Sequence, residues 1–189
     1  MMSKEINRLA IFDLDGTLLN TIGDLAEACN YMLSLRELGS HTREEYAKMV
    51  GNGILNLVKR ALPEELHTDE YAMAARADFL DFYTANIDRH TRPYDGIYEV
   101  LRTLQEEGWS LAVASNKFDE GTQKLVRSIF PDIHFSAIYG NKEGFPLKPD
   151  PALLHLIIKE CGASPETTFM IGDSGVDIRT AKDAGVRSI

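Results

Sequence analysis

The sequence predicts an α/β protein whose parallel-sheet core is interrupted by an inserted helical bundle. After residue 93, short apolar runs alternate with stretches of helical periodicity, which is typical of right-handed βαβ units and a parallel sheet. Between residues 20 and 87, apolar residues recur at helical spacing and no convincing strand occurs. We therefore expect an α/β core formed by residues 1–19 and 88–189, with a helical domain at residues 20–87.

The first strand and the helices of the inserted domain follow from local pattern. Residues 9–12 (LAIF) form a continuous apolar run, as in a strand buried on both faces. Apolar spacing predicts helices near residues 22–33, 54–61 and 71–82. Thr42 and Glu45 have the spacing of a capping box and predict the start of a further helix between the first two.

The second part of the chain alternates between the two element types. Strands are predicted at residues 111–114, 135–139 and 168–171, and helices near residues 97–104, 122–130 and 177–184. Another helix has Pro151 in its first turn, and a last strand starts at Val186. The chain stops at Ile189, where we would expect a further crossover and strand.

Composition excludes several classes of function. The net charge of −9 and the pI near 5.0 argue against broad binding to nucleic acids or anionic membranes. Only two cysteines occur, Cys29 and Cys161, too few for a disulfide framework. The N-terminus lacks a signal-peptide pattern, and no apolar run approaches the roughly 20 residues that cross a bilayer. These features predict a cytoplasmic protein.

Acidic residues follow the first strand directly, in residues 13–17 (DLDGT). Ligands of open α/β sheets bind at the carboxyl ends of strands, and residues two apart on an extended chain point the same way. Asp13 and Asp15 are therefore expected to face one site. Gly16 permits a sharp turn that brings N–H groups close to an anion, so we expect Gly16 and Thr17 to contact phosphate.

A second acidic cluster, residues 172–177 (GDSGVD), follows another apolar strand and contains Asp173 and Asp177. Carboxylates gathered at neighbouring strand ends repel one another unless a cation or a proton lies between them. Oxygen ligands with few protein contacts suit Mg²⁺, which also accepts phosphate oxygens. The candidate metal-binding residues are Asp13, Asp15, Asp173 and Asp177.

Two ordinary explanations compete for these acids. Any single Asp can be a helix N-cap or a loop residue. A calcium-binding EF-hand loop does not fit residues 13–17, because it needs a third acid or amide and a glycine at position six, where Leu18 stands.

Two further segments complete the candidate site. Ser115, Asn116 and Lys117 follow the strand at residues 111–114 and offer a hydroxyl and turn N–H groups for phosphate. Lys148 stands just before a helix start, between prolines that fix the chain. Each is weak alone, since polar turns and surface lysines are common. Together, in this order and at these strand ends, the four segments are specific, and the phosphate-binding candidates become Gly16, Thr17, Ser115, Asn116 and Lys148.

With these four motifs, the sequence resembles the haloacid dehalogenase (HAD) superfamily of phosphotransferases over residues 9–189. The resemblance implies a Rossmann-like core, and the helical insertion is similar to the C1 cap of that family. Residues 50–53 (VGNG), 60–62 (RAL), 92–96 (RPYDG) and 115–117 (SNK) resemble the phosphoglycolate phosphatase branch.

The resemblance also implies roles for the residues. Asp13 would attack phosphorus and form an aspartyl-phosphate, and Asp15 would act as the acid and then the base. Ser115 and Lys148 would hold the phosphoryl oxygens. Mg²⁺ would be bound by Asp13, Asp173 and the backbone carbonyl of Asp15, with Asp177 adjusting the metal site from outside. Relatives that cleave carbon–halogen bonds need no acid to protonate an alkoxide leaving group. An Asp at position 15 therefore argues against dehalogenation.

The cap is expected to close over the site and to select the leaving group. Its candidate specificity segment is Gly51, Asn52 and Gly53, which can equally be an ordinary helix-start turn. The preferred function is a Mg²⁺-dependent phosphatase acting on a small phosphate ester, as a monomer or weak dimer. A sugar-phosphate mutase of the beta-phosphoglucomutase type is the alternative, and a non-catalytic metal- or phosphate-binding module is a third possibility.

Overall fold

The computed structural model describes residues 7–189, which form two compact units. The α/β unit contains the chain up to Leu19 and Pro93–Ile189, and the helical unit is Asn20–Arg92. The domain division predicted from the sequence, with a helical domain at residues 20–87, stays a prediction. Within residues 7–189, no helix is both long enough and apolar enough to cross a bilayer.

The α/β unit is built on a five-stranded sheet with the order β5-β4-β1-β6-β7. Neighbouring strands pair in parallel throughout, and Leu9 of the first strand is opposite Ser110 on one side and Thr168 on the other. The strands are β1 (Leu9–Phe12), β4 (Ser110–Phe118), β5 (Ala137–Asn141), β6 (Thr168–Ile171) and β7 (Arg187–Ser188). The predicted fold class, with a parallel sheet and flanking helices, is confirmed.

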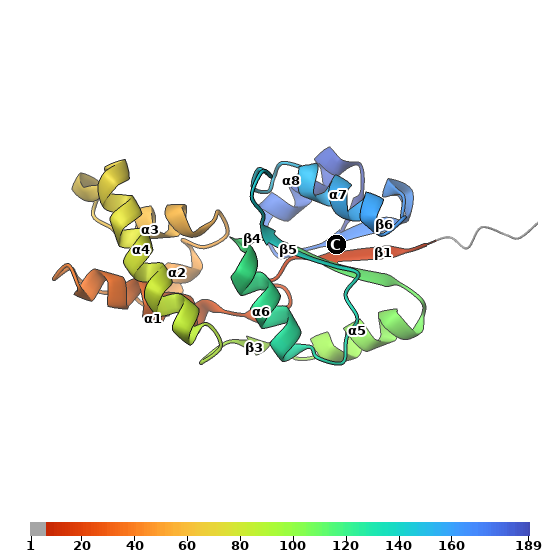
Figure 1. The fold of residues 1–189 in the computed structure, drawn as a ribbon, viewed down its shortest axis with the longest axis horizontal. Helices are drawn as coiled ribbons and strands as arrows, with labels where there is room; N and C mark the ends of the chain where they lie inside the picture. The colour runs from red at the N-terminus through yellow and green to blue at the C-terminus, as the bar shows by residue number, and fades with distance from the viewer. Residues whose placement is uncertain (1–6) are drawn as a thin grey trace, which may run out of the picture. The chain divides into compact units, whose positions relative to one another are not determined.

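Helices cover both faces of this sheet. In Figure 1, α7 (Ala152–Glu160) and α8 (Gly175–Ala184) lie on one side, and α5 (Ile97–Glu106) and α6 (Asp119–Ile129) lie on the other. The apolar positions of β1, β4 and β6 pack with those of α7 and α8 in one buried cluster. Burial on both faces explains why β1 is apolar at all four positions.

Four helices make up most of the helical unit: α1 (Ile22–Ser34), α2 (Arg43–Ala47), α3 (Ile54–Ala61) and α4 (Asp69–Asn86). The expected capping box starts α2, since the Glu45 N–H donates to the Thr42 hydroxyl at 3.2 Å and the Thr42 N–H donates to the Glu45 carboxylate at 2.7 Å. Tyr46, Phe79 and Tyr83 are fully buried and supply aromatic bulk to this unit. Short 3₁₀ turns occur at Glu64–Leu66 and, in the α/β unit, at Pro165–Thr167.

Two short strands stand where the chain passes between the units. β2 (Leu19–Asn20) and β3 (Arg92–Pro93) pair with each other in a separate two-stranded sheet. The start and the end of the helical unit are therefore joined by backbone hydrogen bonds.

One local prediction is wrong. Ser115, Asn116 and Lys117 were expected in a turn after a strand at residues 111–114, but β4 continues through all three to Phe118. No glycine or proline interrupts the segment, so polar side chains alone do not end the strand. The pairing of β4 with β5 does become irregular between Ala114 and Phe118.

Candidate active site

The candidate site lies at the carboxyl ends of the three central strands. β1 stands between β4 and β6, and the connections from these strands run to opposite sides of the sheet, which is where open α/β sheets bind ligands. Asp13 follows β1 directly. Its N–H donates to the Ile171 carbonyl at the end of β6, at 2.9 Å, and its carboxylate accepts from the Leu14 N–H at 2.7 Å.

Lys148 joins two carboxylates at the centre of the site. Its Nζ lies 3.0 Å from Asp13 Oδ1 and 2.7 Å from Asp177 Oδ1. The Lys148 and Asp177 side chains are each 2% exposed, and that of Asp13 is 13% exposed. A buried lysine between two acids is a fixed positive charge beside the carboxylate proposed as nucleophile.

The pKa values of Asp13 and Lys148 are shifted by burial and by the charges of their neighbours. Burial raises the pKa of Asp13 from 3.8 to about 6, against the opposing effect of Lys148, and the Asp177 and Asp15 carboxylates raise it further. Burial alone would lower the pKa of Lys148, but Asp13 and Asp177 hold it above its ordinary value. Additional positive charge would therefore be favourable at Asp13.

Asp13, Asp173 and Asp177 form a cluster that can hold a metal ion, because one carboxylate oxygen from each lies within 4.8 Å of the others. Asp177, at the start of α8, is held from two sides. Its Oδ1 accepts from Lys148, and its Oδ2 accepts from the Ser174 hydroxyl at 2.6 Å. Asp173 is exposed and accepts from the Thr17 hydroxyl at 3.2 Å. The donor set is all oxygen, as a hard divalent cation requires.

Glycine is needed at position 16 for two reasons. Gly16 has φ of +91°, and a Cβ placed there would come within 2.5 Å of the Asp173 carboxylate. Its N–H donates to the Leu19 carbonyl at 2.9 Å, and the Thr17 N–H faces the Leu14 carbonyl at 3.4 Å. Both N–H groups predicted to meet phosphate therefore have partners within the loop.

Ser115 and Asn116 are buried in β4 and differ in their surroundings. The Ser115 hydroxyl accepts from the Lys117 N–H at 3.3 Å. The Asn116 side chain spans the backbone of Lys148: its Nδ2 donates to the Lys148 carbonyl at 3.0 Å, and its Oδ1 accepts from the Lys148 N–H at 2.8 Å. Asn116, predicted to bind phosphate, thus fixes the position of Lys148.

Lys117 is a site residue that the sequence-based prediction left out. Its Nζ lies 3.2 Å and 3.4 Å from the two carboxylate oxygens of Asp15. The Lys117 side chain is 2% exposed and that of Asp15 is 23% exposed. Strand alternation is the signal that could have found it. Residues two apart on a strand share a face, so the Lys117 side chain is expected on the same face as that of Ser115.

The predicted specificity residues lie in the helical unit, directly before α3. Gly51 and Gly53 have φ values of +108° and +81°, in the region that favours glycine. The Asn52 carbonyl accepts from the Asn56 side chain at 2.7 Å. The role of these three residues in selecting the substrate stays a prediction.

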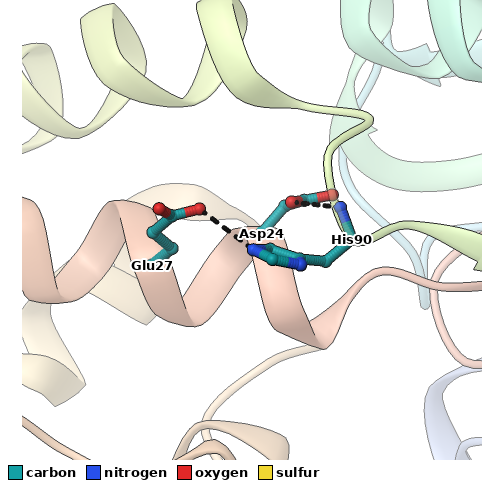
Figure 2. A group of neighbouring side chains, drawn as sticks. All are labelled: Asp24, Glu27 and His90. Atoms are coloured by element: carbon teal, nitrogen blue, oxygen red, sulfur yellow. Dashed lines mark hydrogen bonds and ion pairs between the residues drawn. The ribbon is translucent and has the colours of Figure 1, made fainter.

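The helical unit also contains a cluster of Asp24, Glu27 and His90 that pattern reading missed (Figure 2). Asp24 is 1% exposed, and its carboxylate accepts from the N–H groups of His90 and Thr91, both at 2.8 Å, and from the Thr91 hydroxyl at 2.7 Å. Glu27 pairs with the Arg89 guanidinium at 2.8 Å and with His90 Nε2 at 3.4 Å. The Arg89 guanidinium already pairs with Glu27, and backbone and hydroxyl donors already bind Asp24, so we assign the cluster a structural role: it attaches residues 90–91 to α1.

This fold, with carboxylates and a buried lysine at the ends of three parallel strands, defines a class of hydrolase. The family model described as haloacid dehalogenase-like hydrolase matches residues 10–189, and the chain belongs to this family. A phosphoglycolate phosphatase from Mesorhizobium japonicum is 34% identical over 94% of this chain and 79% of its own length. Phosphoglycolate phosphatase 1 from Pseudomonas aeruginosa is 35% identical over 95% and 67%, respectively.

The solved structures agree with the sequence relatives. A crystal structure from Lactobacillus delbrueckii subsp. bulgaricus matches with a TM-score of 0.90 and 30% identity, over 97% of this chain and 85% of that chain. The predicted family, fold class and enzyme class, a phosphatase resembling the phosphoglycolate phosphatases, are therefore confirmed.

Proposed function

We propose that this phosphatase hydrolyses a small phosphomonoester, with phosphoglycolate as the first candidate, in a Mg²⁺-dependent reaction that passes through an aspartyl-phosphate on Asp13. One observation carries the proposal. The Asp13 carboxylate lies 3.0 Å from the buried Lys148 ammonium and belongs to an acidic cluster that can hold a divalent cation. A nucleophile in that position meets a phosphoryl group whose charge is neutralised from two sides.

The first half-reaction forms the aspartyl-phosphate. A carboxylate oxygen of Asp13 attacks phosphorus, and the bond from phosphorus to the ester oxygen breaks. Asp15 donates its proton to the departing alkoxide, which leaves as the alcohol. In the second half-reaction, Asp15 takes a proton from water, the resulting hydroxide attacks phosphorus, and the Asp13 carboxylate is restored as inorganic phosphate leaves.

Lys148 and Ser115 are assigned to the non-bridging phosphoryl oxygens. Lys148 is held rigidly, because Asn116 binds its backbone on both sides and Asp177 binds its Nζ. Positioning of this kind lets the ammonium stabilise charge in the transition state with little rearrangement.

Asp13 and Asp173 would hold Mg²⁺ through their carboxylates, and Asp15 would do so through its backbone carbonyl. Asp177 would act from outside through its bonds to Lys148 and Ser174. The raised pKa of Asp13 supports a cation at this point, because a nearby positive charge keeps the nucleophile ionised. When bound, Mg²⁺ would neutralise charge on the phosphoryl oxygens.

The remaining assignments concern substrate and setting. Gly51, Asn52 and Gly53 are proposed to contact the leaving group, and the partner is a small phosphate ester rather than a nucleic acid or a membrane. The free thiols of Cys29 and Cys161 fit a reducing cytoplasm. We propose a monomer or a weak dimer.

The test is phosphate release from a panel that contains phosphoglycolate, p-nitrophenyl phosphate and sugar phosphates, with Mg²⁺ and after chelation with EDTA. We expect Mg²⁺-dependent release, abolished by Asp13→Asn, and a hydroxylamine-sensitive phosphoprotein in rapid-quench samples of the wild type. Interconversion of sugar phosphates without net phosphate release would instead identify a mutase. Full turnover by the Asp13→Asn protein would exclude the nucleophile assignment.

A further inference from the structure

The helical unit contains a polar pocket of about 280 Å³, and all of its lining residues belong to that unit. Three segments that lie far apart in the sequence line it. Helix α1 contributes Gly23 and Glu27, the start of α2 contributes Arg43, and His90 follows α4. Pockets for drug-sized ligands begin at roughly 300 Å³, so this volume suits a small ligand rather than a nucleotide or a coenzyme.

Arg43 gives the pocket a positive charge that no neighbouring acid neutralises. Its guanidinium makes no hydrogen bond and no ion pair within residues 7–189. The acid in the lining is Glu27, which already pairs with Arg89 at 2.8 Å and with His90 at 3.4 Å. Helix α2 gains no stability from this arginine, because a cation in the first turn opposes the helix dipole. The pocket is therefore suited to an anion.

Gly23 leaves the space between Arg43 and His90 open. A Cβ at position 23 would lie 2.7 Å from His90 Cβ and 3.8 Å from Arg43 Cζ, so both side chains border the same point. The backbone does not require glycine there, since Gly23 lies in α1 with ordinary helical φ. Glycine in a helix is destabilising relative to alanine. We infer that glycine is present because a side chain would fill this space.

The cluster of Asp24, Glu27 and His90 holds the histidine at the edge of the pocket. The Asp24 carboxylate accepts from the His90 N–H at 2.8 Å, and Glu27 Oε2 lies 3.4 Å from His90 Nε2 (Figure 2). His90 Nδ1 has no hydrogen-bond partner in the part of the chain that the structure describes. The ring nitrogen left for a ligand is therefore Nδ1, which donates when protonated and accepts when neutral.

We propose that this pocket is a second anion site and that it binds a phosphate group, with Arg43 as the main contact and His90 as the other. A guanidinium donates two parallel N–H bonds to two phosphate oxygens. Hydrogenphosphate has acceptor oxygens and an O–H group, so it can pair with His90 Nδ1 in either protonation state. An ionised carboxylate has two oxygens and no donor, and it should bind less tightly. The site does not depend on the reaction proposed at Asp13.

The test is an NMR titration of the metal-free protein with inorganic phosphate, in EDTA and at constant ionic strength. The Gly23 amide reports on the pocket, and the Gly172 amide reports on the α/β unit, so binding in the two units is observed separately. At Gly23 we expect saturation with a Kd on the order of 1–10 mM. In Arg43→Met this Kd should rise about 10-fold, as for the loss of one charge-assisted hydrogen bond. Arg43→Lys should recover part of the affinity. Lys48→Met, at the exposed end of the same helix, is the matched control and should bind as wild type does.

Other anions test the chemistry of the site. Acetate should bind at Gly23 at least about 10-fold less tightly than phosphate. Glycerol 3-phosphate separates the two sources of the group: tighter binding than inorganic phosphate would identify a phosphorylated metabolite, and weaker binding would identify free phosphate, each in support of a phosphate site.

Three results would overturn the proposal. They are a Gly23 amide that does not shift up to about 100 mM phosphate, an unchanged Kd in Arg43→Met, and acetate bound as tightly as phosphate. A shift at Gly172 alone would also reject the pocket while leaving the proposed function intact. Conversely, saturation at Gly23 that Arg43→Met weakens would support the pocket even if the protein released no phosphate from any ester.

Discussion

Replacing Asp13 by asparagine is expected to inactivate the enzyme and, in the metal-free protein, to stabilise its fold. Burial raises the pKa of this carboxyl from 3.8 to about 6, so ionised Asp13 is less favourable in the folded protein than in the unfolded chain. Each unit of pKa corresponds to about 1.4 kcal/mol, and the rise therefore corresponds to about 3 kcal/mol at pH 8. An asparagine avoids this cost, because it resembles the neutral acid.

The sign of the pH dependence of the free energy of unfolding follows from the raised pKa of Asp13. Well below its ordinary pKa of 3.8 the carboxyl is protonated in both states and contributes nothing; its cost grows between pH 3.8 and about 6 and is constant above that range. The free energy of unfolding of wild type minus that of Asp13→Asn should thus be about −0.5 kcal/mol at pH 4 and about −3 kcal/mol at pH 8.

Urea denaturation in EDTA at pH 4, 6 and 8 measures this difference. Mg²⁺ should then stabilise the wild type more than the variant, since a cation ligand has been removed. Asp132→Asn is the control, because the Asp132 side chain is 73% exposed in the same unit. A variant that is less stable than wild type in EDTA at pH 8, or a difference that does not change with pH, would refute the reasoning.

Three further predictions concern other contacts. Gly16→Ala should lower kcat/KM at least about 100-fold and weaken Mg²⁺ binding in calorimetry, because the new Cβ would displace the Asp173 carboxylate and the backbone has φ of +91°; unchanged Mg²⁺ affinity would contradict this. Asp24→Asn should lower the free energy of unfolding by about 2–4 kcal/mol in urea, since a buried acceptor of three hydrogen bonds becomes part donor; a loss below about 0.5 kcal/mol, typical of a surface change, would count against it. Thr42→Ala should cost about 1 kcal/mol in the same measurement, because the capping box of α2 is lost, and an equally stable variant would show that this helix end does not limit stability.

Interactions close in sequence could be predicted. The capping box of Thr42 and Glu45 depends on residues three apart, and the buried strand β1 is visible in four consecutive apolar residues. The ends of parallel strands meet at one edge of a sheet, so Asp13 and Asp173 could be brought together once the strands were placed.

Interactions between residues that are distant in the sequence could not be predicted. The ion pair of Lys117 with Asp15 joins residues 102 positions apart, and the bond of Thr91 to Asp24 joins residues 67 apart. The spacing of residues predicts which face of a strand or helix a side chain lies on, but not which residue of another element it contacts. The polar run around Lys117 also resembled a turn, because local composition does not reveal that β5 continues to pair with β4.

The pairing of β2 with β3 has a consequence for the design and evolution of such chains. Since Asn20 and Arg92 stand on paired strands, the two ends of the helical unit lie next to each other. An insertion with adjacent ends can be exchanged for another segment, or for a short turn, without stretching the sheet that carries Asp13. Substrate preference that belongs to the insertion would thus be transplanted with it, whereas the phosphate-transfer chemistry proposed for Asp13 would remain with the sheet.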